Sequence, residues 1–493
     1  MSSIFTKIKG LLSESIIYGI SGILSRFITI FLVPLYTKVF LPEDYGTIGL
    51  INNGYVLITI ALVFAMDNAS ARWFYDTTSN ADRKDTINTW FWFYLFNSCI
   101  AAVLLILIAP YISSALFSHD VKSILYIKLV AITIPITVCN TVINNVLRFG
   151  RKPIPCVIIS LVVSIVTIIL NIVFVLYFHA SVKGIYIAQL LAAIIGLCCS
   201  LPYLRKWISW PSIYNWNKLK AMLIYGWPFV PAGLAYWVVN LSGVYFVNFY
   251  LTKQDVGLYQ IGTSVASAIG LVVNAFQQAW SPFAFSIIKE TNARKTYANI
   301  LDVYTVLISS ACVGLSLFSH EALMILTNSK YYSAAGVASI LAFSYFFIGL
   351  TSIADLGTAI VKSTKPLGFI MTISGFVILI MNIVLLPIMG KNGAALTLCI
   401  SQSIVPIYMF YKSQKAYYIP YELTKLIIIT SLAILLSGAG FYFTTLSLSL
   451  LTLVSIKASI FLLYFFLIAS VYKSSFVGLQ RTWKSKRRFS SSI

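Results

Sequence analysis

Charged side chains inside long apolar stretches are the residues of this chain most able to carry chemistry. Arg26 lies about halfway along an apolar run from residue 16 to residue 36, where its side chain reaches neither end of a spanning helix. A cation at that depth can line a wet cavity and bind an anionic group such as a phosphate. The alternative is a structural arginine, neutralised by carbonyl groups or by Asp67 or Asp355. Because the apolar runs hold so few charges, we favour the binding role.

Four further charged residues are candidates for the same cavity: Asp67, Arg72, Lys128 and Arg148. Lys128 is about 10 Å from the outer end of its expected helix at 1.5 Å per residue, so it can also extend to that interface. Arg72 and Arg148 mark inner ends of expected helices. For these three cations we favour the simpler role of interfacial charges that fix topology, whereas for Asp67 the two roles are balanced.

Polar residues at helical spacing give two stripes with different interpretations. The stripe within residues 257–280 predicts a cavity wall for sugar hydroxyls, and an interhelical packing seam is its alternative. Its members are Thr263, Ser267, Gly270, Asn274, Gln277 or Gln278, and the following Trp280. The stripe within residues 154–178 is interpreted as a packing seam. Its members are Ser160, Ser164, Thr167 and Asn171.

Two prolines interrupt the apolar run 221–250. Pro228 and Pro231 each remove a backbone hydrogen bond, which bends a helix and predicts a hinge for alternating access. A static kink is equally compatible with them. Asn240, farther along the same run, is a candidate amide of the cavity.

The composition identifies the elements that position these residues. Of 493 residues, 59% are apolar and only 10% are charged, whereas soluble proteins have about 25% charged residues. Such a chain is an integral membrane protein of the all-α class. Apolar runs predict about fourteen transmembrane helices. Their approximate ranges are 14–36, 46–68, 88–110, 122–146, 154–178, 184–204, 221–250, 257–280, 298–318, 333–355, 367–389, 393–411, 424–445 and 450–472.

The distribution of charged residues indicates the orientation of the chain in the membrane. The chain has 35 Lys and Arg against 14 Asp and Glu, and most of the cations fall on one side when the N-terminus is placed in the cytoplasm. This positive-inside pattern predicts that both termini are cytoplasmic, and it gives no support to nucleic-acid binding.

An internal repeat divides the chain. Lys152-Pro153 and Asn171-Ile172-Val173 recur as Lys365-Pro366 and Asn382-Ile383-Val384, about 210 residues later. Two parallel six-helix repeats place a substrate site between the halves, as in transporters. The predicted parts are residues 1–204, residues 205–415, two extra helices within residues 416–472, and a basic cytoplasmic tail, residues 473–493.

The sequence gives little support to a metal site, a cofactor site or an enzyme active site. The seven cysteines have no metal-ligand spacing, so we expect neither a metal site nor a cofactor. The chain has only three histidines and short outer loops, which disfavours a membrane enzyme such as a polysaccharide polymerase or ligase. We therefore expect no enzymatic activity.

Motifs near the N-terminus carry a family resemblance. Leu24-Ser-Arg26-Phe-Ile runs into Pro34-Leu-Tyr-Thr-Lys38 and Leu41-Pro-Glu-Asp44-Tyr-Gly46, and Asp255-Val-Gly257-Leu-Tyr259 follows in the second repeat. With the repeats, they resemble the bacterial polysaccharide transporters, including the Wzx-type O-antigen flippases. That family belongs to the multidrug/oligosaccharidyl-lipid/polysaccharide exporter superfamily. The resemblance extends to about residue 415.

The resemblance implies a flippase of the bacterial inner membrane. Its substrate would be an undecaprenyl-diphosphate-linked oligosaccharide of O-antigen, lipopolysaccharide or another surface polysaccharide, moved from the cytoplasmic to the periplasmic leaflet by alternating access. Arg26 corresponds to the family's cationic cavity residue on the first helix. Many members carry an Asp-Arg pair where this chain has Ser242-Gly243. An Na+ or H+ gradient or the membrane potential would drive transport, and the polysaccharide polymerase and chain-length machinery would be partners.

Three alternatives remain open at this point. A cation-coupled multidrug or metabolite antiporter of the related family would need embedded carboxylates, and the interior offers mainly Asp67 and Asp355. A membrane enzyme and a scaffold of polysaccharide assembly are the other two.

Overall fold

The described part of the chain is helical. The structure is a computed structural model that describes residues 32–118, 120–150, 152–209, 215–443, 449, 451–468 and 470–471. These residues contain helices and turns and no β-strand, which confirms the all-α prediction. Arg26, most of the predicted span 14–36 and the tail 473–493 lie outside the described residues.

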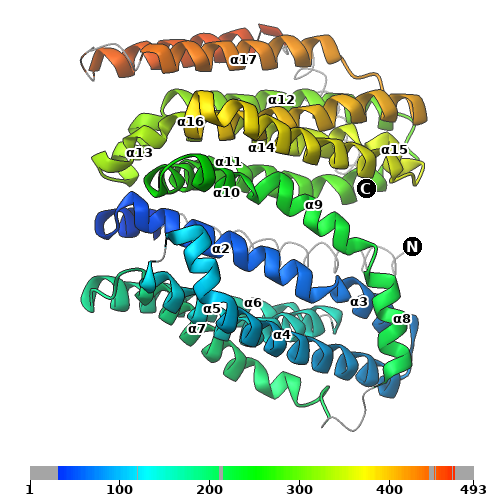
Figure 1. The fold of residues 1–493 in the computed structure, drawn as a ribbon. Helices are drawn as coiled ribbons and strands as arrows, with labels where there is room; N and C mark the ends of the chain where they lie inside the picture. The colour runs from blue at the N-terminus through cyan, green and yellow to red at the C-terminus, as the bar shows by residue number, and fades with distance from the viewer. Residues whose placement is uncertain are drawn as a thin grey trace. The chain divides into compact units, whose positions relative to one another are not determined.

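The chain forms two compact units, Met1–Gly257 and Leu258–Ile493. The helices of the first unit, in chain order, are α2 (Pro42–Val63), α3 (Met66–Asp76), α4 (Asn80–Phe117), α5 (Val121–Phe149), α6 (Pro153–Asn171), the π-helix η1 (Ile172–Tyr177), α7 (Ser181–Leu204), α8 (Trp216–Gly226), α9 (Phe229–Leu241) and α10 (Gly243–Tyr250). Within this unit α5 packs against α4 and α7, and α6 packs against α7 (Figure 1).

The second unit contains the remaining helices. Helix α11 (Lys253–Ser286) begins just before the boundary. It is followed by α12 (Ala293–Leu317), α13 (Ser319–Leu326), the 3-10 helix η3 (Ser329–Ala334), α14 (Ala335–Ala354), α15 (Leu356–Ile360), α16 (Lys365–Ala416), α17 (Leu423–Phe443) and a final helix, Leu451–Ile468. Helix α14 packs between α12 and α16, and α12 also packs against α17.

Many of these helices are long and apolar enough to cross a membrane. The described residues include 11 such spans, or up to 12 if the bent pair α8 and α9 counts as one. Every predicted span after the first overlaps a helix in the described residues. Gly390, with φ 57° and ψ −143°, interrupts the 52-residue α16 between the predicted spans 367–389 and 393–411. The number of fourteen spans stays a prediction.

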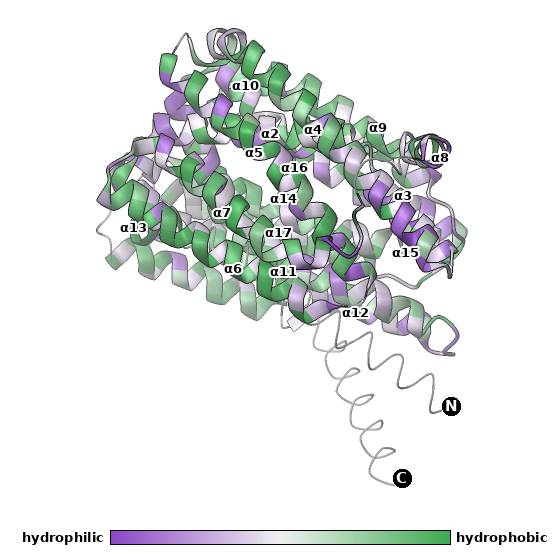
Figure 2. Cartoon of the chain, turned by 90° about the horizontal axis from the view of Figure 1, so that it is seen from below, coloured by the Kyte–Doolittle hydropathy of each residue, from purple (hydrophilic) through white to green (hydrophobic). Residues whose placement is uncertain are grey.

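The outer surfaces of the long helices are apolar. Exposed side chains such as Leu104 and Leu107 on α4, and Phe369 and Phe376 on α16, point away from the buried cores. Such surfaces are solvated by lipid rather than by water. In Figure 2 the helices α6, α9 and α17 are mostly green, whereas purple residues concentrate on α3 and α8.

The second span is broken where the sequence predicted a continuous helix. Helix α2 ends at Val63, and Phe64 and Ala65 adopt left-handed backbone conformations with φ of 46° and 50°. The end of α8 packs onto this break so closely that a Cβ on Gly226 would lie 2.4 Å from the carbonyl oxygen of Phe64. Asp67 is therefore not inside a span that continues to residue 68, as predicted, but in the first turn of the separate helix α3.

Candidate functional site

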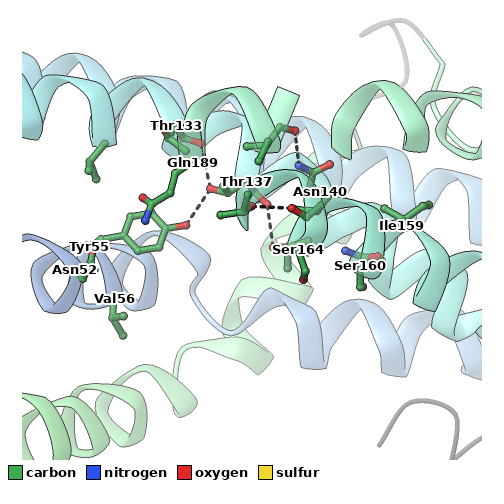
Figure 3. Close-up of a pocket in the computed structure, with 17 residues that line it drawn as sticks. Asn52, Tyr55, Val56, Thr133, Thr137, Asn140, Ile159, Ser160, Ser164 and Gln189 are labelled. Atoms are coloured by element: carbon green, nitrogen blue, oxygen red, sulfur yellow. Dashed lines mark hydrogen bonds between the residues drawn. The ribbon is translucent and has the colours of Figure 1, made fainter. Parts of the chain in front are cut away.

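A cavity of about 550 Å³ lies among α2, α5, α6 and α7 of the first unit. Its residues come from the middle part of each helix, and Figure 3 shows their side chains turned toward a common space. We call it the α5–α6 pocket, because those two helices supply most of its polar wall. The polar lining consists of Asn52, Tyr55, Thr133, Thr137, Asn140, Thr141, Asn144, Ser160, Ser164, Thr167 and Gln189.

Helical periodicity brings these side chains to one wall. On α5, Thr133, Thr137 and Thr141 recur every four residues, and Asn140 and Asn144 follow the same spacing on a neighbouring row. Residues four apart lie above one another on a helix, so the two rows form one polar face. Ser160, Ser164 and Thr167 do the same on α6.

The hydrogen bonds of the wall leave oxygen acceptors facing the cavity. Thr137 directs its hydroxyl hydrogen to backbone carbonyl groups of α5, at 2.9 Å from Ile134 O and 3.1 Å from Thr133 O. Since that hydroxyl has one hydrogen, the 2.9 Å contact with Tyr55 is a bond that Tyr55 donates (Figure 3). Asn140 Nδ2 donates to Ala193 O at 2.9 Å, while the buried Oδ1 of Asn140 has no hydrogen-bond partner.

None of the described residues that line the pocket is charged. A phosphate in a low-dielectric cavity needs a cation beside it, because its desolvation is otherwise too costly. Hydroxyl and amide groups of a ligand need only hydrogen-bond partners, which this wall supplies. The described wall therefore offers hydrogen-bond partners of the kind that an uncharged polar group needs.

The predicted residues Asp67 and Arg148 come together at the end of α5 that follows the pocket. Asp67 Oδ1 accepts hydrogen bonds from Tyr94 Oη at 3.1 Å and from Asn145 Nδ2 at 3.3 Å. Helix α3 is not among the candidate spans. Burial raises the pKa of the Asp67 carboxyl, and the two hydrogen bonds and the charge of Arg148 act in the opposite direction. This cluster adjoins the pocket in sequence, since Asn144 lines the cavity and Asn145 holds the carboxyl.

Arg72 and Lys128 are not among the lining residues of the pocket. The side chain of Arg72 is 56% exposed, pairs with Asp76 at 3.6 Å and lies 4.9 Å from the centre of the Tyr225 ring. Lys128 is half-buried on α5, two residues before the lining residue Val130. The interfacial role of Arg72 and Lys128 stays a prediction.

The predicted stripe on α11 makes contacts within the second unit. Gln277 Nε2 donates to Ser352 Oγ at 2.7 Å, and the buried Trp280 donates from Nε1 to Ser352 O at 2.8 Å. Asn274 Nδ2 donates to Gly270 O on its own helix at 2.6 Å, and Gln278 is exposed. The contacts of Gln277 and Trp280 with α14 are those of an interhelical seam, the alternative that the sequence left open.

The predicted hinge coincides with a break between helices. Helices α8 and α9 are bent by 45°, with Pro228 at the start of α9 and Pro231 in its first turn. Asn240 is half-buried near the other end of α9 and donates from Nδ2 to Tyr236 O at 2.9 Å. The bend lies where the prolines predicted it, and its movement during transport stays a prediction.

Sequence reasoning missed the pocket residues of α5 and misinterpreted those of α6. Ser160, Ser164 and Thr167 line the cavity rather than filling a packing seam. The available signal was two consecutive spans, each with hydroxyl and amide residues at four-residue spacing on one face. Within the described residues, no group of three or more His, Cys, Asp or Glu side chains is placed to hold a metal ion.

Comparison with known proteins identifies the family and the fold. A family model described as "Polysaccharide biosynthesis protein" matches residues 37–336, more than half of the chain. The lipid II flippase MurJ, in an inward-closed conformation, has a TM-score of 0.75 at 15% sequence identity, covering 94% of this chain and 100% of that chain. None of the curated proteins compared with this chain matches it.

Multidrug transporters share the same fold. An inward-facing MATE family transporter of the MOP superfamily has a TM-score of 0.64 at 14% identity, covering 80% of this chain and 97% of that chain. An outward-facing structure from the same family has a TM-score of 0.58 at 15% identity, covering 83% and 95%. These matches show a shared fold, and the family model carries the family assignment that the sequence motifs predicted.

Proposed function

Because this chain belongs to the polysaccharide biosynthesis protein family, we propose that it is a flippase for a lipid-linked oligosaccharide. The proposed substrate is an undecaprenyl-diphosphate-linked repeat unit, carried from the cytoplasmic to the outer leaflet of the bacterial inner membrane. The observation that carries the proposal is the uncharged polar pocket in the middle of four apolar spans. Sugar hydroxyls need hydrogen-bond partners throughout their passage across hydrocarbon, and this pocket offers them at mid-depth.

The described helices supply the parts that alternating access requires. The α2–α3 and α8–α9 breaks lie against each other at Phe64 and Gly226, so the chain has two interrupted helices at one place in the first unit. Interrupted helices are common where transporters change conformation around a midplane site. The polyprenyl tail stays in lipid, while the head group passes through the protein.

The diphosphate of the substrate needs a cation. Arg26 fits that role from its position in the first apolar run, and Arg148 stands beside the Asp67 cluster at the end of α5. Both termini are proposed to be cytoplasmic, and the charge distribution supports that orientation. The chain would act without enzymatic chemistry or a cofactor, drawing on an Na+ or H+ gradient or on the membrane potential, and it would serve the polysaccharide polymerase and chain-length machinery.

The related antiporter function is less well supported. An exporter of cationic drugs needs carboxylates at its binding site, and the described lining of the α5–α6 pocket contains none. The one acidic cluster near it, at Asp67, is already held by Tyr94 and Asn145.

Deletion of the gene in the native bacterium tests the function. Lipid-linked intermediates are extracted and assigned to a leaflet by their accessibility to a membrane-impermeant oxidant. The flippase predicts complete glycan units that accumulate in the cytoplasmic leaflet, whereas normal export from the deletion strain contradicts it.

Complementation with variants then tests the cation. Arg26→Ala is expected to abolish export and Arg26→Lys to retain part of it. Thr372→Val serves as the control, because Thr372 is exposed on α16 and bonds only to Gly368 of its own helix. Wild-type export by Arg26→Ala refutes the cavity role of this arginine.

A further inference from the structure

Five hydroxyl groups of the α5–α6 pocket make the same kind of hydrogen bond. Each donates its hydrogen to the backbone carbonyl four residues earlier on its own helix, at 2.7–3.1 Å. The residues are Thr133, Thr137, Thr141, Ser160 and Thr167. A hydroxyl has one hydrogen but two lone pairs, so each of these oxygens can also accept a bond, although Thr137 already uses one lone pair for the hydrogen bond from Tyr55.

An amide oxygen adds to this set of acceptors. Asn140 uses its Nδ2 on Ala193 O, which fixes the orientation of the amide and leaves Oδ1 buried without a partner. A buried polar atom without a partner is unfavourable, so a ligand group that donates a hydrogen bond to this oxygen gains affinity. The wall is thus rich in acceptors that are already oriented before any ligand enters.

The size and neutrality of the pocket restrict its occupant. Its volume of about 550 Å³ lies within the roughly 300–1,000 Å³ of small-molecule sites, too small for a long glycan chain. The described part of its lining has no Lys, Arg or His, so these residues offer hydrogen bonds to a neutral ring and no charge partner to a phosphate or an acidic sugar.

We propose that the α5–α6 pocket is a recognition site for an uncharged sugar ring, which donates its hydroxyls to the oriented acceptors of α5 and α6. The proposal rests on the proposed function, because it takes the ring to be part of the flipped glycan. The diphosphate then binds elsewhere, so the protein reads the sugar and the phosphate at separate places. Asn140 anchors the ring, and the hydroxyls of Thr137 and Thr167 bind it from two helices.

Binding of free sugars tests this assignment apart from transport. The full chain is reconstituted in nanodiscs, and saturation-transfer difference NMR is recorded with glucose, N-acetylglucosamine, glucuronic acid and glucose 1-phosphate. We expect saturation transfer to at least one of the neutral sugars and none to the two charged ones. Equal transfer to charged and neutral sugars, or transfer to none of the four, overturns the proposal and indicates a cavity that holds only water.

Matched variants locate the site. Asn140→Leu and Thr167→Val are each expected to weaken sugar binding by about three- to tenfold, the effect of one uncharged hydrogen bond. Thr372→Val removes a hydroxyl with the same bond to a carbonyl four residues earlier, but on an exposed face outside the pocket, and it should bind as the wild type does. If Asn140→Leu does not fold, Thr167→Val alone decides, because valine keeps its shape. Unchanged binding by every folded pocket variant contradicts the assignment.

A flipping assay in proteoliposomes separates the two proposals. In one outcome, the pocket variants weaken the binding of a neutral sugar, but the wild type does not flip a lipid-linked glycan. This outcome supports the sugar site and refutes the flippase. Flipping by the wild type together with normal flipping and binding by the variants supports the flippase and refutes the pocket.

Discussion

A buried ion pair attaches the last described helix to the second unit. Lys457, in the helix Leu451–Ile468, is completely buried and contacts Glu321 of α13 with 2.6 Å between Nζ and Oε1. The Glu321 side chain is 16% exposed, and its Oε2 has no hydrogen-bond partner. Within the described residues, Lys457 is therefore the cation that neutralises the charge of the Glu321 carboxylate.

Replacement of Lys457 by Met removes that cation and keeps the length of the side chain. Removal of one partner of a buried pair costs about 3–5 kcal/mol, because the other charge stays buried and uncompensated. Glu321 retains some exposure, so we place the loss of stability for Lys457→Met near the lower end, at about 3 kcal/mol. The double variant Lys457→Met with Glu321→Gln leaves no charge, and we expect it to recover about 2 kcal/mol of this loss.

Unfolding in mixed micelles, by titration with SDS, measures the four proteins of this double-mutant cycle. Lys425 offers a matched control on α17, because its side chain is 29% exposed and its partner Glu422 is 55% exposed. Lys425→Met should therefore cost less than about 1 kcal/mol. If Lys457→Met costs no more than Lys425→Met, or if the double variant is no more stable than the single one, the electrostatic reasoning is wrong.

Three further perturbations follow from particular contacts. The side chain of Lys218 is 11% exposed and forms ion pairs with Asp82 at 2.5 Å and Asp85 at 2.8 Å. Lys218→Met should therefore destabilise the first unit by about 2 kcal/mol, measured by SDS unfolding. Asp76→Asn is the exposed control, and equal effects of the two variants would contradict this prediction. Gly390→Ala should cost about 1–3 kcal/mol in the same assay, since φ 57° with ψ −143° suits glycine alone, and an unchanged midpoint would count against strain at this kink. Burial raises the pKa of the Asp67 carboxyl above its ordinary value of 3.8. The stability that the protonated form contributes is therefore present below pH 3.8 and is lost as the pH rises through the folded-state pKa. The unfolding midpoint of Asp67→Asn should lack this decline, and parallel pH profiles of the variant and the wild type would refute the prediction.

The sequence predicted well those features that depend on one segment alone. The apolar run 122–146 became α5, Val121–Phe149, because the length of an apolar run is itself what makes a helix span a membrane. The bend near Pro228 and Pro231 was likewise local, since proline removes its own backbone hydrogen bond. Such effects need no knowledge of the neighbouring helices.

Features that depend on distant segments were harder to predict. The break at Phe64 and Ala65 lies where α8 approaches at Gly226, and no local signal in the run 46–68 announces that contact. The stripe of Ser160, Ser164 and Thr167 has the same spacing in a packing seam as in a cavity wall. The distance from α6 to α5 and α2 decides whether the stripe lines a cavity or packs against a neighbour. The spacing of residues within one helix does not predict that distance.

Helix α5 carries both the polar wall of the proposed sugar site and the residues of the Asp67 cluster. Five of its residues between Thr133 and Asn144 line the pocket, Asn145 donates to the Asp67 carboxyl, and Arg148 follows four residues after Asn144. Four residues rise about 6 Å along a helix, so the guanidinium-bearing residue stands about one turn beyond the pocket wall. A sugar ring bound by hydroxyl acceptors and a phosphate held by a cation are adjacent groups in the proposed substrate. In the proposed complex the ring and the phosphate therefore bind at separate places along one helix, and the phosphate has a cation outside the pocket.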